Sequence, residues 1–162
     1  MRPTRDKTWI SVAHQIAERA TCLRRHVGCV LVNKRGHVLA TGYNGVAAGV
    51  PHCNAPDEFD PRDGACGYPE IFPHACLGAA MPSGQGLDQC QAIHAEQNAL
   101  LQCGDVWDIH TCYVTVSPCL TCVKLLMNTS CKRIVFAEEY VHAEAKELWL
   151  NSKGDRTWEQ LD

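Results

Sequence analysis

Four residues with catalytic or metal-binding side chains stand in two short motifs of the chain. His94 and Glu96 form a His-x-Glu motif, and Cys119 and Cys122 form a Cys-x-x-Cys motif. A zinc ion that activates water takes three protein ligands and keeps a fourth position open, and one imidazole with two thiolates supplies that number. Glu96 is then available to carry protons. The four residues therefore predict a hydrolytic zinc site.

The His-x-Glu motif has to lie at the start of a helix. The apolar pattern after it predicts a helix over residues 94–103. Because residues two apart do not share a helix face, His94 must lie at or before the first turn if Glu96 is to reach the same zinc ion. The partial positive charge of the helix N-terminus would then favour thiolates and hydroxide at the metal.

The Cys-x-x-Cys motif is predicted to open a second helix, over residues 118–129. Ser117 is a suitable N-cap and Pro118 a suitable first residue, which would place Cys119 and Cys122 on one face of the first turn. A redox pair or a zinc ribbon is the alternative, with His-x-Glu as an accidental helix start. His-x-Glu followed by Pro-Cys-x-x-Cys is typical of zinc-dependent nucleobase deaminases, which favours the catalytic interpretation.

Alternating strands and helices are predicted around these motifs, as in an α/β protein. The predicted helices cover residues 6–22, 94–103, 118–129 and 142–151, and the predicted strands cover residues 27–32, 37–42, 111–116 and 133–137. The first two strands predict a hairpin, and the strand, helix and strand that follow residue 111 predict a parallel βαβ unit. The polar tail after residue 151 would add a short strand or pack on the surface.

Length and composition predict one domain over residues 1–162. The chain has eleven cysteines. It shows no secretory leader and no apolar run near the ~20 residues that a membrane span needs. We therefore expect reduced thiols, metal binding and a cytoplasmic location. The formal charge of −3 counts against a polynucleotide partner, because phosphate backbones are bound through clustered positive charge. No membrane association is expected.

An irregular segment at about 46–92 is rich in glycine, proline, cysteine and histidine. Such a long segment cannot order itself through apolar burial, so its thiols predict a metal staple, with scattered free thiols in a mobile loop as the alternative. The loop before it is either a plain turn or a place where the backbone approaches a ligand, with Asn44 offering both a donor and an acceptor. Arg24 and Arg25 could meet a phosphate or form a solvated pair.

Several segments resemble the cytidine deaminase superfamily and, within it, the deoxycytidylate deaminases. The resemblance is carried by residues 20–28, by Thr-Gly-Tyr-Asn-Gly at 41–45, by His-Ala-Glu-Gln-Asn-Ala at 94–99 and by residues 134–140. It implies a three-layer αβα fold with a mixed five-stranded sheet flanked by helices. It also implies that His94, Cys119 and Cys122 bind the catalytic zinc and that Glu96 carries protons.

Further site residues are implied by the same resemblance. Asn44, Ala95, Ser117 and Tyr140 would bind the substrate, and Tyr43, Gly45, Gly49 and Arg24 would contact a regulatory nucleotide. A structural zinc would be held by Cys22, Cys53, Cys76 and Cys90, with His52, Cys66 and His74 as alternatives for the fourth ligand.

The activity implied is the hydrolysis of dCMP to dUMP and ammonia, which feeds dTMP synthesis. The resemblance also implies activation by dCTP with Mg²⁺, inhibition by dTTP and a homo-oligomer, with a hexamer favoured. The alternatives are a related zinc deaminase that acts on another free nucleotide, or on a base in RNA or single-stranded DNA, and a non-catalytic zinc-stapled module that senses nucleotides.

Overall fold

A computed structural model of the chain describes residues 1–22, 24–49, 52, 91–140 and 143–162. Most of the predicted insertion at 46–92 lies outside these residues. Among the predicted ligands of a structural zinc, Cys53, Cys66, His74, Cys76 and Cys90 also lie outside them. No helix in the described parts of the chain is long and apolar enough to cross a membrane.

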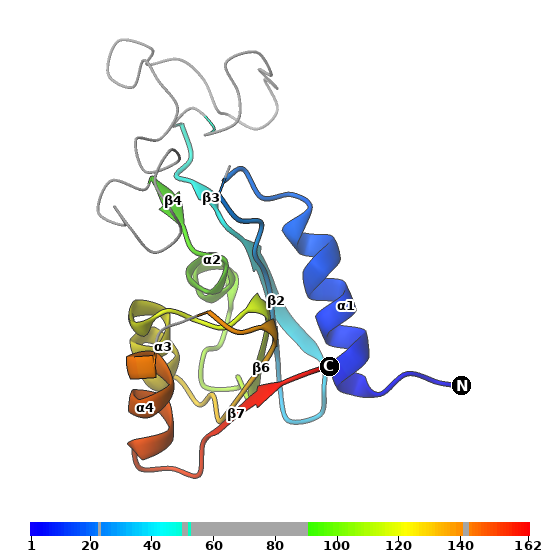
Figure 1. The fold of residues 1–162 in the computed structure, drawn as a ribbon, viewed down its shortest axis with the longest axis vertical. Helices are drawn as coiled ribbons and strands as arrows, with labels where there is room; N and C mark the ends of the chain where they lie inside the picture. Colours follow the sequence, from blue (N-terminus) through cyan, green and yellow to red (C-terminus); the bar gives the residue numbers. More distant parts are fainter. Residues whose placement is uncertain (23, 50–51, 53–90, 141–142) are drawn as a thin grey trace.

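A mixed five-stranded sheet forms the middle of the fold (Figure 1). Its strands, in spatial order, are β2 (Val38–Tyr43), β1 (Gly28–Val32), β5 (Thr111–Val116), β6 (Arg133–Glu138) and β7 (Thr157–Gln160). β1 is antiparallel to β2 and to β5, whereas β5, β6 and β7 are parallel. The predicted hairpin, the parallel βαβ unit and the mixed sheet are confirmed, and the polar tail forms the edge strand β7.

Helices cover both faces of the sheet, which gives the predicted three layers (Figure 1). α1 (Arg5–Ala17) packs on one face, and α2 (Ala95–Gln102), α3 (Leu120–Met127) and α4 (Ala143–Asn151) lie on the other. β1 is buried on both faces: Cys29 and Leu31 pack toward α2, and alternate residues pack toward α1. This burial explains why β1 is a continuous apolar run.

α1 ends at Ala17, earlier than the predicted helix over residues 6–22. The chain leaves the helix because its next segment bonds to the end of β2. The Thr21 N–H donates to the Asn44 carbonyl, and the Asn44 N–H donates to the Val27 carbonyl. These tertiary hydrogen bonds outweigh the helical propensity of the segment.

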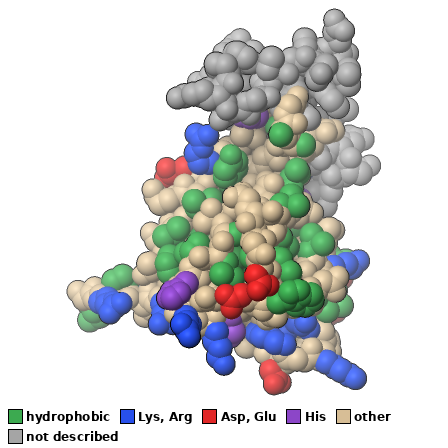
Figure 2. Space-filling view, turned by 180° about the vertical axis from the view of Figure 1, so that it is seen from behind, with side chains coloured by type: hydrophobic (Ala, Val, Ile, Leu, Met, Phe, Trp, Pro, Cys, Tyr) green, Lys and Arg blue, Asp and Glu red, His purple; other side chains and the backbone are tan. Residues whose placement is uncertain are grey.

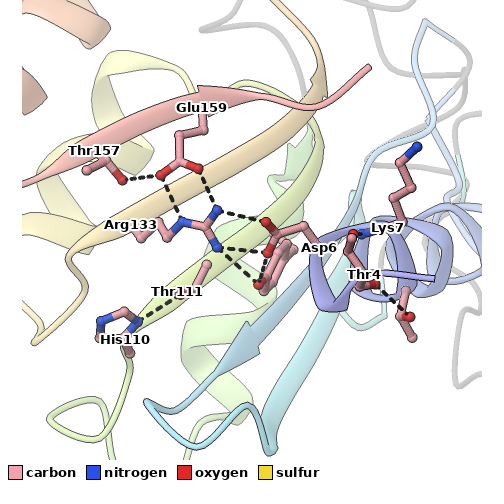
Figure 3. Close-up of polar contacts among 10 residues, drawn as sticks. Thr4, Asp6, Lys7, His110, Thr111, Arg133, Thr157 and Glu159 are labelled. Atoms are coloured by element: carbon pink, nitrogen blue, oxygen red, sulfur yellow. Dashed lines mark hydrogen bonds and ion pairs between the residues drawn. The ribbon is translucent and has the colours of Figure 1, made fainter. Parts of the chain in front are cut away.

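Arg133 links three elements on the α1 side of the sheet (Figure 3). Its guanidinium donates two hydrogen bonds of 2.8 Å to the Asp6 carboxylate on α1 and also pairs with Glu159 on β7. The Tyr113 hydroxyl donates to Asp6 at 2.6 Å. The hydrogen bond from Arg133 lowers the pKa of Asp6, so the network favours the ionised carboxylate.

Lysine and arginine side chains gather at the end of the molecule that lies away from the grey residues (Figure 2). Exposed basic residues in this part of the fold include Lys34 and Arg35 in the β1–β2 turn and Lys132 before β6. The candidate active site lies at the opposite ends of β5 and β6, so this basic surface is separate from it.

Candidate active site

His94, Cys119 and Cys122 come together where two helices begin. His94 is the N-cap of α2, and Cys119 is the N-cap of α3. His94 Nδ1 lies 3.4 Å from the Sγ atoms of both cysteines, and the three ligand atoms all lie within 4.8 Å of one another. His94 therefore precedes the first turn, as its spacing from Glu96 requires.

The start of the second helix differs from the prediction. α3 begins at Leu120, so Cys119 caps the helix and Ser117 does not. The Ser117 hydroxyl instead accepts a hydrogen bond from the Tyr140 N–H at 2.7 Å. Since this bond occupies the side chain that would have capped the helix, the first turn moves toward the C-terminus. The motif still directs both thiols toward His94.

The donor set fits a zinc ion in type and spacing. Zinc binds imidazole nitrogen at ~2.0–2.1 Å and thiolate sulfur at ~2.3 Å, so a tetrahedral site separates the two kinds of donor by about 3.5 Å. The two N···S distances of 3.4 Å agree with that separation. Three ligands leave one tetrahedral position open, which is the arrangement of a catalytic zinc.

Cys119 and Cys122 differ in the pKa of their thiols. The hydrogen bond from Cys122 is the main cause that lowers the pKa of Cys119 to about 3. The same bond, together with burial, raises the pKa of Cys122. Because zinc binds thiolates, metal binding would release the proton that Cys122 retains.

Glu96 is a buried carboxyl group in the first turn of α2, with 4% of its surface exposed. Burial raises its pKa to about 6, and the neighbouring His94 acts in the opposite direction. A carboxyl group with a pKa near neutrality can both accept and donate a proton at working pH. Its position beside the three ligands is therefore suited to acid–base catalysis.

Gly42 allows α2 to approach β2 closely. A Cβ atom at Gly42 would lie 2.3 Å from the Ala95 carbonyl oxygen and 2.4 Å from the Ala99 nitrogen. Any larger residue would therefore push away the helix start that carries His94 and Glu96. The glycines of the motif at 41–45 predict a turn or a close approach of the backbone to a ligand, whereas at Gly42 the close approach is to the backbone of α2.

A pocket opens beside two of the three candidate metal ligands, His94 and Cys119. All four predicted substrate residues, Asn44, Ala95, Ser117 and Tyr140, line it together with Glu96. Arg24, Arg25 and Cys22 are also in its wall. The structure thus brings the predicted catalytic and substrate residues into one pocket, and it places Arg24 here as well.

Asn44 uses its side chain to hold part of the pocket wall. Its Oδ1 accepts from the Val27 N–H at 2.7 Å, and its Nδ2 donates to the Arg25 carbonyl at 2.7 Å. A primary amide has a second N–H and a second lone pair. Asn44 can therefore bind a ligand while it fixes residues 25–27.

Arg25 and Tyr140 form another part of the wall. The Arg25 guanidinium lies 5.3 Å from the centre of the Tyr140 ring, and its Nη2 bonds to Glu138 at 3.1 Å. Its Nη1 is buried and has no hydrogen-bond partner among the described residues. Ser117 supports this wall, because its N–H bonds to the Glu138 carbonyl and its hydroxyl to the Tyr140 N–H.

A second pocket is lined by three of the four residues predicted to contact a regulatory nucleotide: Tyr43, Gly45 and Gly49. Asn98 and Gln102 of α2 also line it, as does His52. Beside it, β3 (Gly45–Val46) pairs with β4 (Ala92–Ile93), which leads directly into His94. The fourth predicted residue, Arg24, lines the first pocket instead.

A known protein family matches most of the chain. The model of the cytidine and deoxycytidylate deaminase zinc-binding region matches residues 3–138. The chain belongs to this family of zinc-binding deaminases. Within the family, the similar proteins include deoxycytidylate deaminases, as the sequence resemblance predicted.

Two relatives illustrate the extent of the match. The deoxycytidylate deaminase of Schizosaccharomyces pombe is 36% identical over 141 residues, which cover 86% of this chain and 38% of that protein. The deoxycytidylate deaminase of Mycobacterium phage D29 is 35% identical over 140 residues, which cover 85% of this chain and 98% of that protein. The chain thus spans well under half of the fungal relative and nearly all of the phage relative.

A solved structure has the same fold. The dCMP deaminase from the cyanophage S-TIM5, in complex with dCMP and dUMP, has a TM-score of 0.66 and 22% sequence identity, over 99% of each chain. Its apo form has a TM-score of 0.63. This likeness confirms the predicted cytidine-deaminase-like fold.

Proposed function

We propose that this chain catalyses the hydrolytic deamination of dCMP to dUMP, with release of ammonia. The observation that carries the proposal is the buried Glu96 beside the His94, Cys119 and Cys122 cluster, in the wall of a pocket. Further support comes from the phage D29 relative, which the match covers almost completely, and from the fold neighbour whose complex contains dCMP and dUMP.

Zinc on these three residues would supply an activated water for attack on C4 of the cytosine ring. Glu96 accepts a proton from that water and transfers it to N3 of the ring. Glu96 then takes the proton of the hydroxyl group that has added to C4 and delivers it to the amino group, so that the C4–N bond breaks as the C4=O bond forms and ammonia leaves. One carboxyl group can serve all these steps because they occur in sequence, and its raised pKa suits both directions of transfer.

Backbone groups at the two helix starts would assist the reaction. The N–H groups of Ala95 and Cys119 lie at the N-termini of α2 and α3, where the helix dipoles are positive. Such groups stabilise the negative charge that develops as water adds to the ring. We therefore assign these two N–H groups an electrostatic role.

The pocket wall supports a nucleoside monophosphate as the substrate class. Arg25 has a buried Nη1 without a partner among the described residues, which suits a phosphate oxygen, and Arg24 adds positive charge. The second N–H of Asn44 suits a sugar hydroxyl, and Tyr140 offers an aromatic face.

Regulation by nucleotides is the second part of the proposal. We assign the second pocket to dCTP as activator and dTTP as inhibitor, each with Mg²⁺. Asn98, which lines that pocket, donates to the Tyr43 carbonyl at 2.8 Å, so a ligand there contacts both α2 and the end of β2. A coupling of ~1–3 kcal/mol would change dCMP affinity by ~5–150-fold.

Assembly and a second metal complete the proposal. The proposed assembly is a homo-oligomer, with a hexamer favoured. Cys22 is 6% exposed and lines the first pocket. We propose that it binds a structural zinc together with Cys53, Cys76 and Cys90.

The test measures ammonia release from dCMP, dCTP, cytidine and deoxyoligonucleotides, together with zinc content. We expect activity on dCMP, and we expect Glu96→Gln to lose about 10²–10⁴-fold in turnover while it keeps zinc. Activity on another nucleotide or on oligonucleotides alone would support a related deaminase. Nucleotide binding without ammonia release would support a sensing module.

A further inference from the structure

We propose that Gln97 is a positioning residue for the metal centre, because it holds the His94 backbone so that Nδ1 faces both thiols. This inference rests on the zinc site of the proposed function. Gln97 lies in the first turn of α2, and its Oε1 accepts a hydrogen bond from the His94 N–H at 2.8 Å. Gln97 acts through His94 and is not itself a candidate ligand.

The main chain of His94 matters because Nδ1 is the nitrogen that lies 3.4 Å from each thiol. Nδ1 is bonded to the ring carbon next to Cβ, so its position depends closely on the backbone angles of His94. As N-cap, His94 is extended, with φ −70° and ψ 156°. Its N–H lies outside the intrahelical hydrogen bonds, and the Gln97 side chain accepts its hydrogen bond.

The ligands come from two separate elements, so the distances between the ligand atoms depend on how the two helix starts are placed. His94 precedes α2, whereas Cys119 and Cys122 belong to the start of α3. Metal sites tolerate deviations of about 0.2 Å in bond length. A rotation of the His94 backbone would change both N···S distances together. The Gln97 hydrogen bond therefore fixes the position of His94 Nδ1, and a movement of the cysteines alone could not restore both distances if that position were lost.

The spacing of Gln97 from His94 is a helix-capping pattern that can be recognised in the sequence. A glutamine or glutamate at the third helical position that accepts from the N-cap N–H is half of a capping box. His94 and Gln97 have that spacing. In most helices this bond only stabilises the helix end, whereas here the N-cap residue is also a candidate metal ligand. Helix capping and metal geometry thus depend on the same hydrogen bond.

Asn98 provides a matched control. Its Nδ2 donates to the Tyr43 carbonyl at 2.8 Å and so anchors the same helix turn to β2. Asn98→Ala removes one side-chain hydrogen bond of α2 but leaves the His94 N–H paired with Gln97. A comparison of Asn98→Ala with the Gln97 variants therefore distinguishes a general loosening of α2 from a loss of His94 orientation.

The experiment uses the full chain loaded with zinc. The rate of zinc transfer to a chromogenic chelator is measured for wild type, Gln97→Met, Gln97→Glu and Asn98→Ala. The visible spectrum of the cobalt(II)-substituted proteins reports thiolate coordination. Methionine has similar length but no acceptor oxygen, whereas glutamate keeps one. We expect Gln97→Met to release zinc about 10–100-fold faster, and Gln97→Glu and Asn98→Ala to stay near wild type.

Each outcome decides the question. Wild-type release from Gln97→Met with an unchanged cobalt spectrum would refute the proposal, as would equally fast release from Asn98→Ala or Gln97→Glu. If circular dichroism shows that Gln97→Met does not fold, Gln97→Asn, whose amide is too short to reach, takes its place with the same expectation. A wild-type chain that binds no zinc would instead contradict the proposed function.

Discussion

Replacing Glu96 with glutamine should change how the stability of the metal-free chain depends on pH. Burial is the main cause that raises the pKa of Glu96 from its ordinary value of 4.5 to about 6. Each pKa unit is worth about 1.4 kcal/mol, so this difference corresponds to about 2 kcal/mol of folding free energy. Glutamine has the same shape and no charge, and therefore removes this contribution.

The direction of the stability change depends on whether the folded or the unfolded chain binds the Glu96 proton more tightly. A carboxyl group with a raised pKa binds its proton better in the folded chain, so its contribution is fully present below about pH 4.5 and is lost as the pH rises through about 6. Relative to wild type, Glu96→Gln should therefore gain about 2 kcal/mol of stability between about pH 4.5 and about pH 7. The pKa of His94 is raised mainly by its hydrogen bond with Cys119 and in part by the charge of Glu96, so the loss of that charge offsets part of this gain.

Urea unfolding of the chelator-treated chains across this pH range measures the effect. Glu144→Gln, which changes an exposed glutamate on α4, is the matched control and should show no comparable trend. Added zinc should reduce the pH dependence of wild type, because a nearby cation favours the ionised carboxylate. A stability difference between wild type and Glu96→Gln that is the same at both ends of the range would refute the reasoning.

Three further changes test the supports of the site and of the fold. Gly42→Ala should displace the first turn of α2, destabilise the chain by several kcal/mol and weaken zinc retention. Calorimetry and metal analysis measure these effects, and an unchanged melting temperature would contradict the prediction. Ser117→Ala should raise KM for dCMP more than it lowers kcat, because Tyr140 loses its backbone anchor, and Ser117→Thr should restore KM; steady-state kinetics decide. Asp6→Asn should cost about 1–3 kcal/mol near neutral pH, because Arg133 loses an ionised partner. Because the pKa of Asp6 is lowered in the folded chain, this cost should vanish as the pH falls below the ordinary carboxyl range. Urea unfolding at acid and neutral pH measures it, and a stability difference that persists at acid pH would contradict the assignment.

The elements predicted most accurately from sequence are those set by local burial. The predicted strand at 111–116 coincides with β5, because every residue of β5 is buried and its β-branched and aromatic residues form a run of strand length. The predicted helix at 94–103 is close to α2, whose start is fixed by the spacing of His94 and Glu96. Local patterns therefore sufficed wherever burial or ligand spacing determined the element.

The predictions that differ from the structure depend on contacts between distant segments. Ser117 is a good N-cap by local rules, but its hydroxyl bonds to Tyr140 across the end of the sheet. α1 ends early because Thr21 and Val27 bond to Asn44. Such competition for hydrogen bonds cannot be derived from residue spacing, since it depends on which segments the fold brings together.

The end of β2 explains why the Thr-Gly-Tyr-Asn-Gly motif is more than a turn or a ligand contact. Gly42 lets α2 approach, the Tyr43 carbonyl accepts the Asn98 amide, and the Asn44 amide holds the backbone at Arg25. Gly42 thus sets the approach of the wall on the α2 side, and Asn44 holds the wall on the Arg25 side. One wall carries Glu96 and His94, and the other carries the guanidinium that suits a phosphate. Any displacement of this strand end would therefore change catalytic geometry and substrate contacts together, which is the physical requirement for regulation from the second pocket.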